Sequence, residues 1–159
     1  MDEDTLPVGM RELMTTAIDE AARYGSGVVE AEHILLALLA DPASAAARTA
    51  AEVGLDHDGF VNALRAERVH SLKAAGITAV DASLLQSTPS RSSQRPTWGA
   101  SIRTLMDDLR RANRGNQRRR LNELDALAVV LRLELGTVPR ALDLAGIDRA
   151  ALVTRLNRP

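Results

Sequence analysis

Glu32 and His33 stand next to each other and are the pair of side chains best suited to proton transfer or metal binding. Catalysis by such a pair needs a third group that orients the histidine and a nucleophile nearby, and the sequence signals neither. A zinc site needs three or four ligands, but the chain has no cysteine, and His33, His57 and His70 follow no recognised ligand spacing. We therefore predict no catalytic residue, no metal site and no cofactor. We expect His33 to hydrogen-bond the backbone near the start of a buried helix.

The sequence also contains no motif for nucleotide binding. A phosphate-cradling loop has the pattern Gly-x-x-x-x-Gly-Lys-[Ser/Thr], which does not occur in the 159 residues, and Lys73 is the one lysine. These observations favour a protein that binds over an enzyme.

Residues 110–120 form the most basic stretch of the chain. Its six arginines are Arg110, Arg111, Arg114, Arg118, Arg119 and Arg120. Three interpretations remain open: contact with nucleic-acid phosphates, contact with the acidic surface of a partner protein, or a solvated loop. No aromatic side chain is interleaved for base stacking, so a nucleic-acid-associated regulator is the alternative function rather than the leading one.

The elements that position these side chains follow from an internal repeat with an offset of 92 residues. Residues 11–64 align with residues 103–156 without a gap, and 10 of the 54 aligned positions are identical. The apolar and helix-ending positions keep their register throughout. The sequence therefore predicts two copies of one small helical unit, packed together.

Composition makes both copies helical, because Ala and Leu dominate and only 2% of the residues are aromatic. Apolar periodicity, glycines and N-cap residues predict four helices in each copy. They cover residues 8–23, 30–39, 44–53 and 56–67, then 101–113, 122–135, 138–145 and 148–156. Residues 1–67 form the first repeat, residues 68–96 a partly mobile linker with a short helical turn at 79–85, and residues 97–159 the second repeat. The predicted core is Leu13, Met14, Ile18, Ile34, Leu35, Leu38, Leu39, Leu64, Leu105, Met106, Leu127, Val130, Leu131 and Leu156.

The net charge of −1 hides an uneven distribution. Residues 1–64 carry 12 acids against 3 arginines, and residues 97–159 carry 12 arginines against 7 acids. Either the two halves attract each other, or one face meets an oppositely charged partner. No apolar run approaches the roughly 20 residues that span a bilayer, and the N-terminus is acidic, so we predict a cytoplasmic protein without a membrane partner.

The segment from Glu30 to Leu39, Glu-Ala-Glu-His-Ile-Leu-Leu-Ala-Leu-Leu, resembles the signature of the Clp N-terminal domain. Gly-Leu-Asp at 54–56 and Gly-Ile-Asp at 146–148 also fall where that family ends its third helix. The resemblance implies an all-α, pseudo-twofold bundle of about eight helices in two four-helix repeats. It also implies the domain that receives substrates and adaptors for the Clp AAA+ unfoldases, here without an ATPase motor.

In the family, Glu32 matches a residue of a surface site that can bind phosphorylated arginine. The matching threonine near the start of the first helix is Pro7 here, and the second copy has Gly99 and Leu124 at the two positions. We therefore expect phosphoarginine binding to be weak or absent.

The resemblance also implies a groove for hydrophobic segments and cyclic peptides, flanked by the openings of the two repeats. Its candidate residues are Leu6, Met10, Trp98 and Ile102, with Arg11, Glu32 and Arg103 as the polar rim. A lone tryptophan in the core is the alternative interpretation of Trp98. The leading hypothesis is a non-enzymatic binding module that serves Clp-dependent proteolysis as adaptor, accessory subunit or decoy. Its partners would be Clp ATPase or protease components, adaptors or hydrophobic peptides, including cyclic peptide antibiotics.

Overall fold

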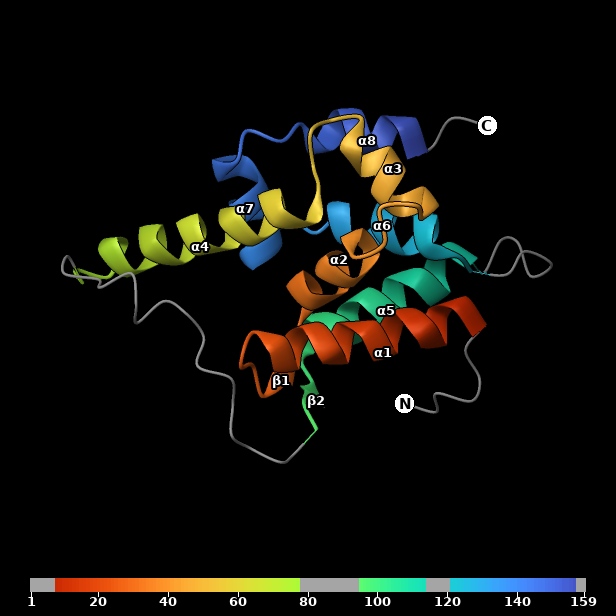
Figure 1. Ribbon diagram of the computed structural model, residues 1–159, viewed down its shortest axis with the longest axis horizontal. Coiled ribbons are helices and arrows are strands. Elements are labelled where there is room, and N and C mark those ends of the chain that lie inside the picture. Colours follow the sequence, from red (N-terminus) through yellow and green to blue (C-terminus); the bar gives the residue numbers. More distant parts are fainter. Residues whose placement is uncertain (1–7, 78–94, 114–120, 157–159) are drawn as a thin grey trace.

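The fold is all-α and consists of two four-helix repeats (Figure 1). The computed structural model describes residues 8–77, 95–113 and 121–156. Within these ranges the elements are α1 (Val8–Arg23), β1 (Val28–Val29), α2 (Ala31–Leu39), α3 (Ala45–Ala51), α4 (His57–Ala74), β2 (Thr97–Trp98), α5 (Ala100–Asn113), α6 (Glu123–Leu131), α7 (Thr137–Leu144) and α8 (Arg149–Leu156). The predicted helical turn at 79–85 lies outside the described residues. None of the described helices is long and apolar enough to cross a membrane.

The predicted register of the repeat is confirmed at the start of every helix, because α5 to α8 each begin 92 residues after α1 to α4. Matching caps explain this. The side chain of Asp56 accepts from the backbone N–H of Gly59 at 2.7 Å at the start of α4, and Asp148 accepts from Ala151 at 2.9 Å at the start of α8. Capping boxes open both α2 and α6. The two copies thus share helix starts even where their side chains differ.

Two helix ends differ from the prediction by more than two residues. Helix α4 continues to Ala74 instead of ending near residue 67, because no helix breaker intervenes before Gly76, whose φ of 86° ends the run. Helix α6 ends at Leu131 instead of residue 135. The carbonyl of Leu133 lies beyond that end and accepts a hydrogen bond at 2.9 Å from Arg149 of α8.

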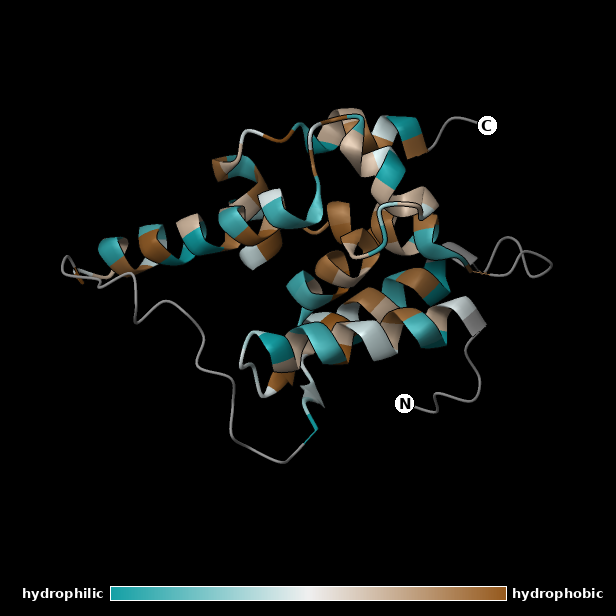
Figure 2. Ribbon diagram, viewed as in Figure 1, coloured by the Kyte–Doolittle hydropathy of each residue, from teal (hydrophilic) through white to brown (hydrophobic). Residues whose placement is uncertain are grey.

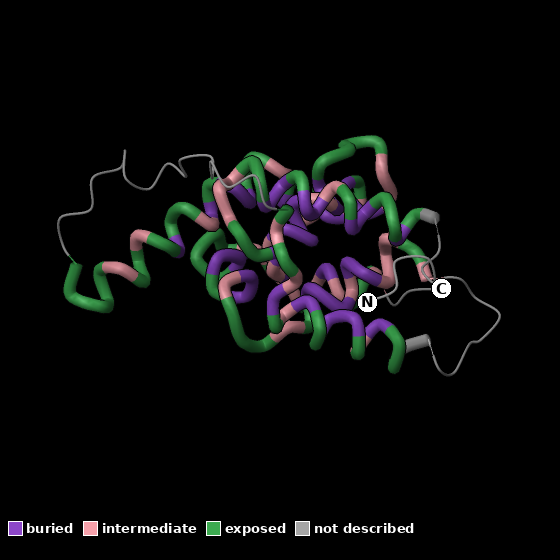
Figure 3. The backbone as a smooth tube through the Cα atoms, turned by 90° about the horizontal axis from the view of Figure 1, so that it is seen from below, coloured by how far each residue is buried: buried purple, intermediate pink, exposed green. Residues whose placement is uncertain are grey.

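The most apolar helices, α2 and α6, lie at the centre of the bundle (Figures 1 and 2). Helices α1 and α5 lie on one side of them, and α3 and α8 on the other. All predicted core residues are buried except Leu64 and Leu156, which are half-buried and pack against the core. Figure 3 shows the buried centre and the exposed far end of α4.

The starts of α2 and α5 are joined across the two repeats, at a place where the sequence predicts no strand. Strands β1 and β2 pair in parallel, with Val29 opposite Trp98. The carboxylate of Glu30 accepts hydrogen bonds from the hydroxyl and, at 3.1 Å, the backbone N–H of Ser101, while the Ser101 hydroxyl accepts from the Ala31 N–H at 2.8 Å. We call this set the Glu30–Ser101 junction. Each helix start is thus capped by the other repeat.

Among the interactions shown for described residues, two ion pairs also link the repeats. Arg140 of α7 donates to Glu67 of α4 at 2.8 Å, and Arg155 of α8 pairs with Glu52 at the end of α3. In both, the first repeat supplies the carboxylate and the second the guanidinium. These pairs agree with the interpretation that the oppositely charged halves attract each other.

Candidate functional site

Glu32 lies in the first turn of α2 and lines two hollows. The first, which we call the α4 hollow, has a volume of about 670 Å³ and lies between the end of α1, α2, α4 and the start of α7. The second, the α5 hollow, has a volume of about 630 Å³ and lies between α5 and the segment that joins α6 to α7. Volumes of this size accommodate several side chains of a peptide. Glu32 is therefore placed where a ligand in either hollow would meet a carboxylate.

The carboxylate of Glu32 is held in an unfavourable environment. Burial raises its pKa, and the nearby carboxylates of Glu30 and Glu67 raise it further, while its own backbone N–H and Arg140 act in the opposite direction. Within the described parts of the chain, no salt bridge pairs this side chain with a cation. Its ionised form is thus partly desolvated and has no cationic partner in a salt bridge.

Glu32→Gln is expected to stabilise the fold at neutral pH. A carboxyl whose pKa is higher in the folded than in the unfolded chain favours folding below its unfolded value of 4.5, and this contribution is lost as the pH rises through the folded pKa. The gain of the glutamine variant should therefore be present at pH 7 and absent at pH 4. Urea unfolding at both pH values measures it, and a loss of stability at pH 7 would contradict it.

His33 has a structural role at the start of α2. The backbone N–H of Glu30 donates to Nδ1 of His33 at 2.9 Å and completes the capping box. His33 is buried, and burial lowers its pKa, so the ring is neutral with Nδ1 as an acceptor. The expectation that His33 hydrogen-bonds the backbone of a buried helix is confirmed.

Comparison with known proteins now identifies the family. A family model of the Clp repeat (R) N-terminal domain matches residues 8–113, more than half of the chain. The chain belongs to the Clp repeat N-terminal domain family. This family and its fold make the chain a Clp-related protein-interaction module, and the Clp N-terminal domain itself is not catalytic.

A solved structure is similar over almost the whole length of this Clp N-terminal domain. It is the N-terminal domain of the caseinolytic protease associated chaperone ClpD from Arabidopsis thaliana, with a TM-score of 0.68 and 15% sequence identity. The match covers 98% of this chain and 94% of that one. At this identity the likeness shows the fold, with both repeats included. A search of curated proteins gives no match.

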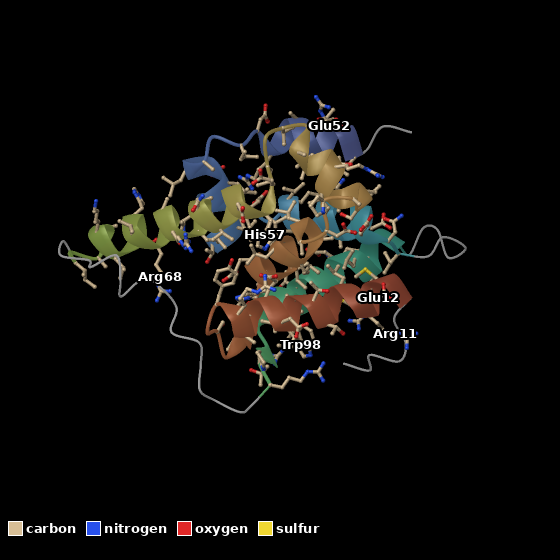
Figure 4. The ribbon with its side chains drawn as sticks, in the orientation of Figure 1. Arg11, Glu12, Glu52, His57, Arg68 and Trp98 are labelled. Carbon is tan, nitrogen blue, oxygen red and sulfur yellow. The ribbon has the colours of Figure 1, made fainter. Side chains whose placement is uncertain are left out.

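The residues predicted to line the groove of this Clp N-terminal domain do not form one exposed surface among the described residues. Met10 and Ile102 are each 1% exposed and belong to the core, so neither side chain is open to a ligand in this conformation. Trp98 on β2 is half-buried and packs against the core (Figure 4). Arg11 and Arg103 are exposed on α1 and α5, Glu32 lines the two hollows, and Leu6 lies outside the described residues. The groove stays a prediction.

The arginine stretch is described only at its beginning. Arg110 and Arg111 are exposed at the end of α5 and pair with Asp107 at 3.2 Å and Asp108 at 2.5 Å. Arg114, Arg118, Arg119 and Arg120 lie outside the described residues. A contact of this stretch with a partner protein or with nucleic acid stays a prediction.

Sequence reasoning missed the arginines of the α4 hollow. Arg65 and Arg68 line it from α4, and Arg23 lines it from the end of α1. The spacing of Arg65 and Arg68 places them on one helix face, which is a signal that the sequence contains. Their approach to Arg23 depends on how α1 and α4 pack.

Proposed function

We propose that this Clp N-terminal domain binds peptides and proteins for Clp-dependent proteolysis, and that the surface around Glu32 is its binding site. The observation that supports this most directly is the partly buried carboxylate of Glu32, which lines both hollows and has no salt-bridge partner among the described residues. Ionisable groups with perturbed pKa values are concentrated at functional sites, because a residue that lowers the stability of the fold is retained where it contributes to binding. The role could be that of an adaptor, an accessory subunit or a decoy for partners of full-length Clp unfoldases.

An affinity capture from native lysate tests the connection to the Clp system. The purified chain is the bait, at moderate salt, and the retained proteins are identified by mass spectrometry. Clp ATPase or protease subunits, or their adaptors, should be retained by the wild type and reduced with Glu32→Gln. A reduced capture is attributed to the site when urea unfolding shows that Glu32→Gln is at least as stable as the wild type. Glu12→Gln, a change at an exposed position of α1, is the matched control and should capture as the wild type does.

A second measurement separates the possible roles. The chain is added to a reconstituted Clp unfoldase and protease that degrades a reporter substrate. An adaptor or accessory subunit increases the degradation rate, whereas a decoy decreases it by competing for the same substrates. If no Clp component is captured and degradation is unchanged at any concentration, the proposed function is wrong.

A further inference from the structure

The lining of the α4 hollow is rich in arginine, although the first repeat as a whole is acidic. Residues 1–64 carry a net charge of −9, from 12 acids and 3 arginines. Yet Arg23 from this segment and Arg65 and Arg68 from the following turns of α4 all line the same hollow. The charge of the lining is therefore positive on the side of α4 and the end of α1, within an otherwise acidic repeat.

Two of these guanidinium groups are available to a ligand. Arg68 is exposed and has no hydrogen-bond or ion-pair partner among the residues that the structure describes. Arg65 is exposed and makes one long hydrogen bond, 3.5 Å, to the side-chain carbonyl of Asn62. Arg23 differs, because it is 3.0 Å from the buried carboxylate of Glu20. Arg65 and Arg68 therefore form the free cationic edge of the hollow.

The acids of the lining do not cancel this edge equally. The carboxylate of Glu67 accepts from Arg140 at 2.8 Å and from Ser71 at 2.7 Å, so its charge is already compensated. Glu32 lines the hollow from α2 and has no salt-bridge partner among the described residues. Carboxylates of a ligand would be repelled by Glu32 and attracted by Arg65 and Arg68. The two sides of the hollow thus set the orientation of an anionic ligand.

The remaining lining is apolar. Leu36 and Val61 are buried below the hollow, and the half-buried Tyr24 and Leu64 add aromatic and aliphatic surface. Helix α4 extends beyond the rest of the bundle, and Figure 4 shows Arg68 projecting from it toward the side on which β1 and the end of α1 lie. An apolar base with a cationic edge fits a peptide with both acidic and apolar side chains better than a free anion or nucleic acid, because neither of those has aliphatic side chains to cover the apolar base.

We propose that the α4 hollow binds an acidic peptide segment of a partner protein, in which carboxylates alternate with apolar side chains. The carboxylates pair with Arg65 and Arg68, and an apolar side chain packs on Tyr24 and Leu64. This inference rests on the proposed function and names the chemistry of the partner.

Fluorescence anisotropy with the full chain tests the inference. The probes are a short labelled peptide in which Asp alternates with Leu, its counterpart with Ser for Asp, and its counterpart with Lys for Asp. The acidic peptide should bind, the other two should bind at least tenfold more weakly, and added salt should weaken the acidic peptide most. Arg65→Gln with Arg68→Gln removes both cationic partners and should lower its affinity by at least about tenfold, since the loss of a single charge-assisted hydrogen bond already costs that much.

Arg48→Gln is the matched control, because Arg48 is exposed on α3 and does not line the hollow. Glutamine and arginine have similar helix propensities, so all these variants should keep the wild-type circular dichroism. Equal affinity for the acidic and serine peptides, no binding of any peptide, or an equal loss with Arg48→Gln would each overturn the inference.

The two proposals fail in different ways. If Clp components are captured equally by the wild type and by the Arg65→Gln, Arg68→Gln variant, and the acidic peptide is not preferred, the acidic specificity is wrong and the Clp connection stands. If the acidic peptide binds as expected but no Clp component is captured, the Clp connection is wrong and the specificity of the hollow stands.

Discussion

Gly99→Ala is expected to lower the free energy of unfolding by about 3 kcal/mol, through overpacking and the loss of a helix cap. A Cβ atom at position 99 would lie 2.0 Å from Oε1 and 2.2 Å from Cδ of Glu30. The Glu30 side chain is long enough to move away, but it would then leave the backbone N–H and the hydroxyl of Ser101 without their acceptor. The substitution therefore opens the Glu30–Ser101 junction. Urea unfolding followed by circular dichroism measures the change.

Gly9→Ala is the matched control, because Gly9 lies in the first turn of α1 with nothing within 4 Å of an added Cβ atom. It should be neutral or stabilise the fold by up to about 1 kcal/mol. A double variant with Glu30→Ala removes the clash, so the costs of Glu30→Ala and Gly99→Ala should not add. Additive costs, or a Gly99→Ala protein as stable as the wild type, would show that the junction does not depend on this close approach.

The starts of the helices were predictable because they depend on local chemistry. Asp56 and Asp148 are good N-caps in any fold, and the 92-residue offset placed both in the same register. The end of α4 is also marked locally, by Gly76 with its positive φ, whereas the end of α6 depends on packing, because the Leu133 carbonyl beyond it accepts a hydrogen bond from Arg149. The strands β1 and β2 were missed for a related reason. Each has two residues, too few for a periodic pattern, and exists because the two repeats meet there.

The candidate site was predictable in part. Glu32 and His33 were singled out as a pair, but the structure separates them by environment: His33 caps its own helix, while Glu32 faces the hollows. Met10 and Ile102 show why apolar residues cannot be assigned to a groove from their type, since groove and core use the same side chains. Gly99 was considered as a lost ligand-site position, whereas its smallness admits the carboxylate of Glu30.

Arg140→Ala is expected to lower the free energy of unfolding by about 2 kcal/mol, because it leaves the carboxylate of Glu67 buried without its cation. The Glu67 side chain is 7% exposed, and the Arg140 side chain is 57% exposed. The cost is therefore smaller than for a pair with both partners buried. Arg155→Ala breaks the other ion pair between the repeats, where both side chains are about half exposed, and should cost no more than about 0.5 kcal/mol. Urea unfolding of both variants at pH 7 makes the comparison.

The dependence on pH separates the ion pair from the packing of the Arg140 side chain. Burial by itself would raise the pKa of Glu67, but the hydrogen bonds from Ser71 and Arg140 and the charge of Arg140 together hold it below its usual value of 4.5. A carboxyl with a lowered pKa stabilises the fold above its unfolded pKa, and this contribution is lost as the pH falls through the folded pKa. The deficit of Arg140→Ala should therefore be complete at pH 7 and shrink below pH 4.5. A deficit that is equal at both ends of this range would mean that Arg140 acts through its aliphatic contacts.

Because Glu67 also lines the α4 hollow, loss of the ion pair should leave an uncompensated carboxylate there and weaken the binding of the acidic peptide as well.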